Sequence, residues 1–171
     1  MKVLVVYDSL YGNTAQVARA IGDAVAGEAE VLGVGEAKPT KLRSFDLVIV
    51  GSPTQGGRAT EAMRAFLARV PALDGASVAV FDTRLPARWV KVFGYAAGKT
   101  ADKLEALGAT LTTEPEGFVV EGKEGPLIAG ELERAAAWAR GVCQEVLPAS
   151  PARLFRYTSG IRGIDAARSR R

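Results

Sequence analysis

The sequence of 171 residues contains no histidine. This absence excludes the Ser-His-Asp hydrolases, Cys-His nucleophilic catalysis and most transition-metal sites, all of which depend on an imidazole. Any chemistry must therefore come from a bound cofactor, or from carboxylates, hydroxyls and arginines.

Cysteine is nearly absent as well, since Cys143 stands alone. A single cysteine excludes an internal disulfide framework, and its place in an expected helix favours a small buried apolar role over a reactive thiol. The chain also has no run of eighteen apolar residues and no signal-peptide pattern at its start. We therefore expect a cytoplasmic protein.

Acidic residues are scarce at the C-terminal end, where residues 150–171 carry six arginines and one aspartate. The other 149 residues keep 16 of the 22 basic and 18 of the 19 acidic side chains, a net charge of −2, so the tail makes the overall charge of +3. We expect one domain over residues 1–148 and a basic tail over 149–171. The tail is either a solvated, flexible end or an electrostatic contact for an acidic partner protein or an anionic membrane, with nucleic acid less favoured.

Short valine-rich runs alternate with helical patterns along the domain. Fully apolar runs of this length fit strands that are covered on both faces, so the alternation predicts a doubly wound α/β fold with a five-stranded parallel sheet and helices on both faces. The expected strands include residues 3–6, 31–34, 47–50, 78–81 and 118–120. The expected helices are 13–27, 60–69, 95–107 and 127–146.

The last expected helix has an amphipathic pattern, with Glu131 on the solvent side together with Glu133, Arg134 and Arg140. The predicted buried stripe consists of Leu127, Leu132, Ala135, Ala136, Ala139 and Val142.

Three polar turns follow expected strands, and the first lies between the strand at residues 3–6 and the helix beginning at 13. It contains Ser9, Leu10, Tyr11, Gly12, Asn13 and Thr14. Hydroxyls and free N–H groups at the positive end of a helix dipole suit a phosphate. The alternative is that Ser9 and Thr14 only cap the first helix.

The second and third turns follow the strands at 47–50 and 78–81. In parallel α/β sheets, ligands bind at the carboxyl ends of the strands, where these turns would meet. The second runs from Gly51 to Thr60, which is the expected helix N-cap, and the third from Asp82 to Trp89.

Two other glycine-containing segments mimic nucleotide motifs but do not satisfy them. Gly94 and the Gly98-Lys99-Thr100 triplet are separated by three residues where a P-loop needs four. Gly33-Val34-Gly35 lacks the third glycine of a dinucleotide fingerprint. Neither supports nucleotide binding.

The chain resembles a flavodoxin over roughly residues 1–146. The resemblance is carried by Ser9-Leu10-Tyr11-Gly12-Asn13-Thr14, by Gly51-Ser52-Pro53-Thr54, and further by Gly94-Tyr95-Ala96-Ala97 and Glu124-Gly125-Pro126-Leu127. It implies strand order 2-1-3-4-5 and an FMN cofactor whose phosphate binds the first turn. It also implies that the flavin ring lies between the second turn, with Pro53, Thr54, Gln55, Gly56 and Gly57, and the third, with Thr83, Arg84 and Leu85.

Two departures from the flavodoxin pattern concern the ring. The second turn has no aromatic residue, so Trp89 either stacks on the flavin or packs against the sheet edge. The turns also carry Arg58, Arg84, Arg88 and Lys91 where classical flavodoxins are acidic. We hypothesise that these cations stabilise the reduced flavin and raise its potential.

The resemblance implies an electron-transfer protein that exchanges electrons with redox partner proteins or a small quinone-like acceptor. Two alternatives remain. One is a flavodoxin-like NAD(P)H, quinone or porphyrinogen oxidoreductase, and the other is an interaction domain of the same fold without flavin.

Overall fold

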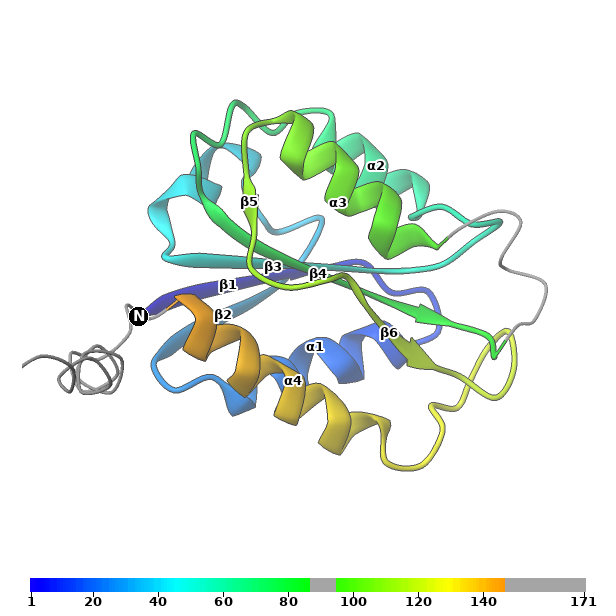
Figure 1. Ribbon diagram of the computed structural model, residues 1–171. Helices are drawn as coiled ribbons and strands as arrows, with labels where there is room; N and C mark the ends of the chain where they lie inside the picture. The colour runs from blue at the N-terminus through cyan, green and yellow to red at the C-terminus, as the bar shows by residue number, and fades with distance from the viewer. Residues whose placement is uncertain (87–94, 147–171) are drawn as a thin grey trace, which may run out of the picture.

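The computed structural model describes residues 1–86 and 95–146, which form a three-layer α/β/α domain (Figure 1). The strands are β1 (Lys2–Tyr7), β2 (Glu28–Gly33), β3 (Leu47–Pro53), β4 (Ser77–Arg84), β5 (Thr110–Leu111) and β6 (Glu116–Val119). The helices are α1 (Asn13–Ala24), the 3-10 helix η1 (Pro39–Ser44), α2 (Glu61–Leu67), α3 (Ala96–Ala106) and α4 (Glu131–Val146).

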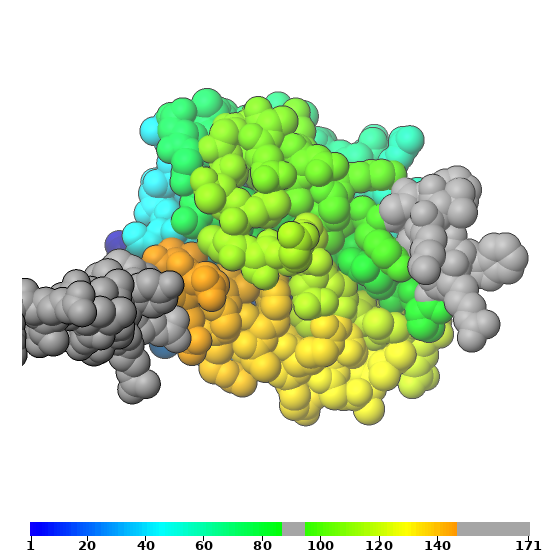
Figure 2. Space-filling model, viewed as in Figure 1, coloured from blue at the N-terminus to red at the C-terminus, as the bar shows by residue number. Residues whose placement is uncertain are grey.

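The sheet is parallel, and its strand order β2-β1-β3-β4-β5 confirms the predicted flavodoxin-like order 2-1-3-4-5. The fifth position is shared by two short strands, because β5 pairs with the start of β4 and β6 pairs with its end. Together with the segment that joins them, these strands form the sheet edge between the two helical layers in Figure 2.

Each sheet face is buried under one pair of helices, which explains why the central strands are apolar without alternation. Helices α1 and α4 pack on one face, around Val5, Ile49 and Phe81. Helices α2 and α3 pack on the other, around Val6, Val48 and Val80. The sheet therefore has no solvent-facing side at its centre, and ligands can reach it only at strand ends or edges.

Close packing at the centre requires a glycine in β3. A Cβ added at Gly51 would lie 2.0 Å from the Phe81 ring, which real Cβ atoms do not approach. Phe81 in turn meets Phe118 and Trp138 edge to face, with ring centroids 5.9 and 6.3 Å away. This aromatic cluster anchors α4 under the end of β4.

The predicted start of the last helix was wrong. Leu127 forms an isolated antiparallel bridge with Val120, and α4 begins at Glu131. Leu132 is 36% exposed, whereas Glu131, expected on the solvent side, is buried. The Glu131 carboxylate accepts hydrogen bonds from the Val119 N–H and the Arg134 guanidinium. A pattern of apolar residues cannot predict that an acidic residue is buried by such bonds.

Other expectations on the elements hold within small shifts. Strand β2 begins at Glu28, three residues before the expected 31–34, and Cys143 is buried on α4 as expected. None of the helices in residues 1–86 and 95–146 has the length and apolarity needed to cross a membrane. The basic tail, Trp89, Arg88 and Lys91 lie outside the described residues.

Candidate functional site

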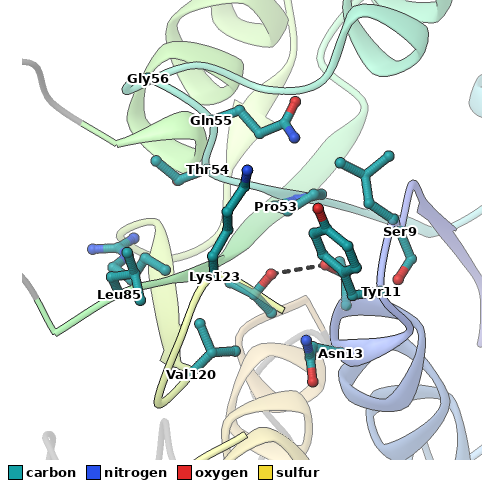
Figure 3. A pocket seen from close by; sticks show the side chains of 14 residues that line it. Ser9, Tyr11, Asn13, Pro53, Thr54, Gln55, Gly56, Leu85, Val120 and Lys123 are labelled. Atoms are coloured by element: carbon teal, nitrogen blue, oxygen red, sulfur yellow. Dashed lines mark hydrogen bonds between the residues drawn. The ribbon is translucent and has the colours of Figure 1, made fainter. Parts of the chain in front are cut away.

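A cavity of about 280 Å³ opens at the carboxyl ends of β1, β3 and β4 (Figure 3). It brings together all three polar turns, as expected for a doubly wound sheet. Its lining consists of Ser9, Leu10, Tyr11, Asn13, Thr14, Pro53, Thr54, Gln55, Gly56, Thr83, Arg84, Leu85, Val120 and Lys123.

The first turn presents several unpaired backbone donors. Gly12 adopts a φ of 87°, a left-handed conformation that glycine tolerates, and α1 begins directly after it. Within the described residues, the N–H groups of Leu10, Tyr11, Asn13 and Thr14 have no hydrogen-bond acceptor. Four free donors at the positive end of a helix dipole form a local site for an anion.

Ser9 binds two backbone N–H groups at the start of α1, whose N-cap residue is Gly12. The Ser9 Oγ accepts hydrogen bonds from the N–H of Gly12, at 3.1 Å, and from the N–H of Ala15, at 3.3 Å. The hydroxyl hydrogen of Ser9 is not used in these bonds and remains able to donate into the cavity.

Thr14 does not cap the helix; it joins the first turn to the third. Its Oγ1 lies 2.8 Å from Oγ1 of Thr83, and both residues are buried. Two hydroxyls that share one hydrogen bond retain one further hydrogen, so the pair has a donor to spare for a ligand.

The second turn closes on itself at the cavity rim. Gln55 and Arg58 exchange two backbone hydrogen bonds of 2.8 and 3.0 Å, and Gly56 between them has a φ of 54°. Nothing lies within 4 Å of a Cβ added at Gly56, so this glycine is required by backbone conformation and faces open space. The Thr54 N–H bonds the Thr83 carbonyl and fixes the second turn against the third.

Behind the second and third turns lies Asp82, a fully buried carboxylate. It accepts hydrogen bonds from Arg84 Nε at 2.5 Å, the Ala97 N–H at 2.9 Å and Thr54 Oγ1 at 3.0 Å. Burial raises the pKa of Asp82 above its usual 3.8, and the ion pair with Arg84 and these hydrogen bonds act in the opposite direction.

The Arg84 side chain makes contacts within the fold. Besides its ion pair with Asp82, the guanidinium lies 3.6 Å from the centre of the Tyr95 ring, a cation–π contact. A carboxylate 2.5 Å away offsets the charge of Arg84, so the effect of this arginine on the flavin potential stays a prediction. Sequence alone does not reveal that the side chains of residues 82 and 84 meet.

A separate set of bonds joins the two ends of the second turn to each other and to Asp8, the residue after β1. Thr60 caps α2 as predicted, its Oγ1 accepting from the Met63 N–H at 3.2 Å and donating to Asp8 at 2.5 Å. Ser52 Oγ accepts from the Thr60 N–H at 3.1 Å. These contacts hold the carboxyl ends of β1 and β3 in a fixed relation.

A fourth segment, residues 120–125, completes the cavity and was missed in the sequence. Val120 and Lys123 line it, and Figure 3 shows the Lys123 side chain reaching across toward Thr54 and Gln55. Asn13 Nδ2 donates to the Glu124 carbonyl at 2.9 Å, and a Cβ on Gly125 would collide with Asn13. In the sequence, the Gly125-Pro126 pair indicates a turn in this segment. It does not indicate that the turn contacts residues 9–14.

Twelve of the fifteen residues predicted from the sequence line this cavity. Gly12 and Gly57 shape its turns without lining it, and Trp89 lies outside the described residues. Arg58 was expected beside the ligand, but it lines a neighbouring groove. The cavity rim is apolar, with Leu10, Tyr11 and Leu85 exposed by 53%, 47% and 45%.

The sequence was compared with models of known protein families. The profile of the flavodoxin domain matches residues 4–92, just over half of the chain. The chain therefore belongs to the flavodoxin-domain family. A comparison with curated proteins finds no match.

Solved structures share the fold over most of the chain. A flavodoxin from the domain Archaea is 23% identical, covering 85% of this chain and 99% of its own, with a TM-score of 0.70. Flavodoxin 2 from Bacillus cereus is 25% identical at the same coverages, with a TM-score of 0.69. The rubredoxin:oxygen oxidoreductase of Desulfovibrio gigas, 18% identical, covers 90% of this chain and 37% of its own, with a TM-score of 0.67.

Proposed function

We propose that this protein binds FMN in the cavity at the ends of β1, β3 and β4, and transfers electrons between redox partners. The single observation that carries this proposal is the first turn, where four N–H groups, all from residues that line the cavity, have no hydrogen-bond acceptor among the described residues. The flavodoxin-domain membership and the similarity to solved flavodoxin structures support it.

The donor set of this chain suits a phosphate monoester. Backbone N–H groups, the spare hydrogen of the Thr14–Thr83 pair and the Ser9 hydroxyl are all neutral donors, and they lie at the start of α1. Among the described residues that line the cavity none is acidic, and Lys123 adds a positive charge. The residues present therefore fit the phosphate of FMN.

The second and third turns suit a flat, polar-edged ring. Gly56 leaves open space at the rim, Pro53 and Leu85 supply apolar surface, and backbone groups of the turns supply hydrogen bonds. FMN, when bound, accepts and donates one or two electrons. The chain holds and orients it, and the apolar rim of Leu10, Tyr11 and Leu85 leaves an exposed edge for partners.

A charge placed on the first turn tests the phosphate site. Leu10 is 53% exposed and lines the cavity, so Leu10→Glu places a negative charge at the first turn. At an effective dielectric constant of about 40, a carboxylate roughly 8 Å from a phosphate dianion costs about 2 kcal/mol. We expect FMN to bind Leu10→Glu at least tenfold more weakly, as measured by fluorescence quenching.

Leu10→Gln is the matched control, because it has the same shape and no charge. Its affinity for FMN should stay within twofold of the unaltered protein. Equal affinities for the Glu and Gln variants would place the phosphate elsewhere. Separately, rapid bleaching by NADPH with turnover of a quinone would identify an oxidoreductase, and a colourless preparation that cannot be reconstituted with FMN would contradict flavin binding.

A further inference from the structure

A second concavity lies between α2 and α3, on the sheet face opposite α1 and α4. We call it the α2–α3 groove; its volume is about 370 Å³. It is lined by Arg58, Ala59, Arg64, Leu67, Lys99, Thr100 and Lys103. Four of these seven side chains are cationic and none is acidic.

Three of the four cations of the α2–α3 groove take part in none of the ion pairs among the described residues. In residues 1–86 and 95–146 the ion pairs involve Lys2, Arg43, Arg84 and Arg134, and none involves Arg58, Arg64 or Lys103. On α3, Lys99 and Lys103 are four residues apart and so project from the same side of the helix. The groove is a cationic surface on a body whose net charge is −2.

The groove adjoins the proposed flavin cavity. Arg58 closes the turn whose other residues, Gln55 and Gly56, line that cavity. On the α3 side, Lys99 lies one turn after Ala96, whose N–H bonds Thr54 Oγ1 at 3.0 Å. A molecule seated in the groove therefore reaches the cavity rim at the tip of the Gln55–Arg58 turn.

We propose that the α2–α3 groove docks the acidic surface of a partner protein beside the flavin cavity. The proposal rests on the proposed electron-transfer function. Exposed cations spread over α2, α3 and the turn before α2 match carboxylates spaced over a protein surface, and the buried Ala59 and Leu67 give an apolar floor. A small polyanion is less favoured, because it needs converging donors and the cations here are distributed over these elements.

Charge reversal within the groove tests the proposal. The variant Arg64→Glu/Lys103→Glu changes two exposed side chains outside the flavin cavity, and Arg19→Glu/Arg140→Glu makes the same change of net charge on α1 and α4. The probe is a plant-type ferredoxin, a small acidic redox protein, and its binding is measured by titration calorimetry at 20 mM and 200 mM salt. Binding does not require flavin, so it is measured with and without FMN.

We expect the unaltered protein to bind the ferredoxin more weakly at high salt. The groove variant should lose at least tenfold in affinity at low salt, and the control variant less than threefold. Equal losses in both variants, or none in the groove variant, would overturn the proposal. Tight binding of inorganic pyrophosphate that the groove variant abolishes, with ferredoxin binding unchanged, would assign the groove to a small polyanion instead. If the protein binds ferredoxin through the groove but does not bind FMN, the docking proposal is supported and the proposed electron-transfer function is refuted.

Discussion

Replacing Arg84 by methionine tests the buried ion pair behind the cavity. Methionine keeps much of the aliphatic length of the side chain but removes the guanidinium that contacts Tyr95 and Asp82, so Asp82 is left buried without its cation. Asp82 is 0% exposed and the Arg84 side chain 18%, so solvent can compensate little. Removing one partner of such a pair costs about 3 kcal/mol in the free energy of unfolding at neutral pH.

The loss should depend on pH in a defined direction. Burial raises the pKa of Asp82 in the folded protein above its usual value of about 3.8. The protonated carboxyl therefore contributes its full stability to the fold below about pH 3.8. This stability is lost as the pH rises through the pKa that Asp82 has in the folded protein. Arg84 lowers the pKa of Asp82. In Arg84→Met this pKa is therefore higher, and stability continues to fall up to a higher pH than in the unaltered protein. The gap between Arg84→Met and the unaltered protein should widen from pH 4 to pH 7.

Urea denaturation followed by tryptophan fluorescence at pH 4, 5, 6 and 7 measures this gap. The double variant Asp82→Asn/Arg84→Met removes both charges, so at pH 7 it should recover at least half of the lost stability. A loss below about 1 kcal/mol in Arg84→Met, or the same loss at every pH, would refute the view that Arg84 neutralises Asp82.

Three further predictions concern other described contacts. Lys123→Gln should lower the midpoint potential of the FMN-loaded protein by roughly 20–40 mV, about 0.5–1 kcal/mol for one electron, in a redox titration; Lys41→Gln is the control, and an upward shift would contradict the role of Lys123. Glu131→Gln should destabilise the fold by about 1–2 kcal/mol at pH 7. Bonds from Arg134 hold the Glu131 pKa below its usual range, so this penalty should shrink as pH falls below about 4.5. A pH-independent penalty in urea denaturation would count against it. Thr60→Ala should cost about 1–2 kcal/mol in the same assay, and a Thr60→Ser variant as unstable as Thr60→Ala would argue against the cap.

The fold was predictable because its signals are local and repeated. Valine-rich strands without alternation report burial on both faces, and the polar turns after β1, β3 and β4 must meet at one sheet edge in a parallel sheet. Predicting this edge required only strand direction and order. For that reason the turns beginning at Ser9, Gly51 and Asp82 were assigned to one cavity from sequence.

The prediction for Glu131 was wrong, and Lys123 was missed. In both cases the position of the side chain depends on contacts with other parts of the chain. The hydrogen bonds of Glu131 to Val119 and Arg134 bury a residue that an amphipathic pattern places outside. Lys123 enters the cavity because the 120–125 segment packs on Asn13, a contact between residues more than a hundred positions apart. No periodicity carries such information.

The most direct test of the central claim compares FMN with riboflavin, which has the same ring and no phosphate. If the first turn binds the phosphate, titration of the apoprotein should give one FMN per chain with a dissociation constant below about 1 μM. Riboflavin should then bind at least a hundredfold more weakly, about 2.7 kcal/mol. Equal affinity for both, or no binding of FMN, would contradict the account.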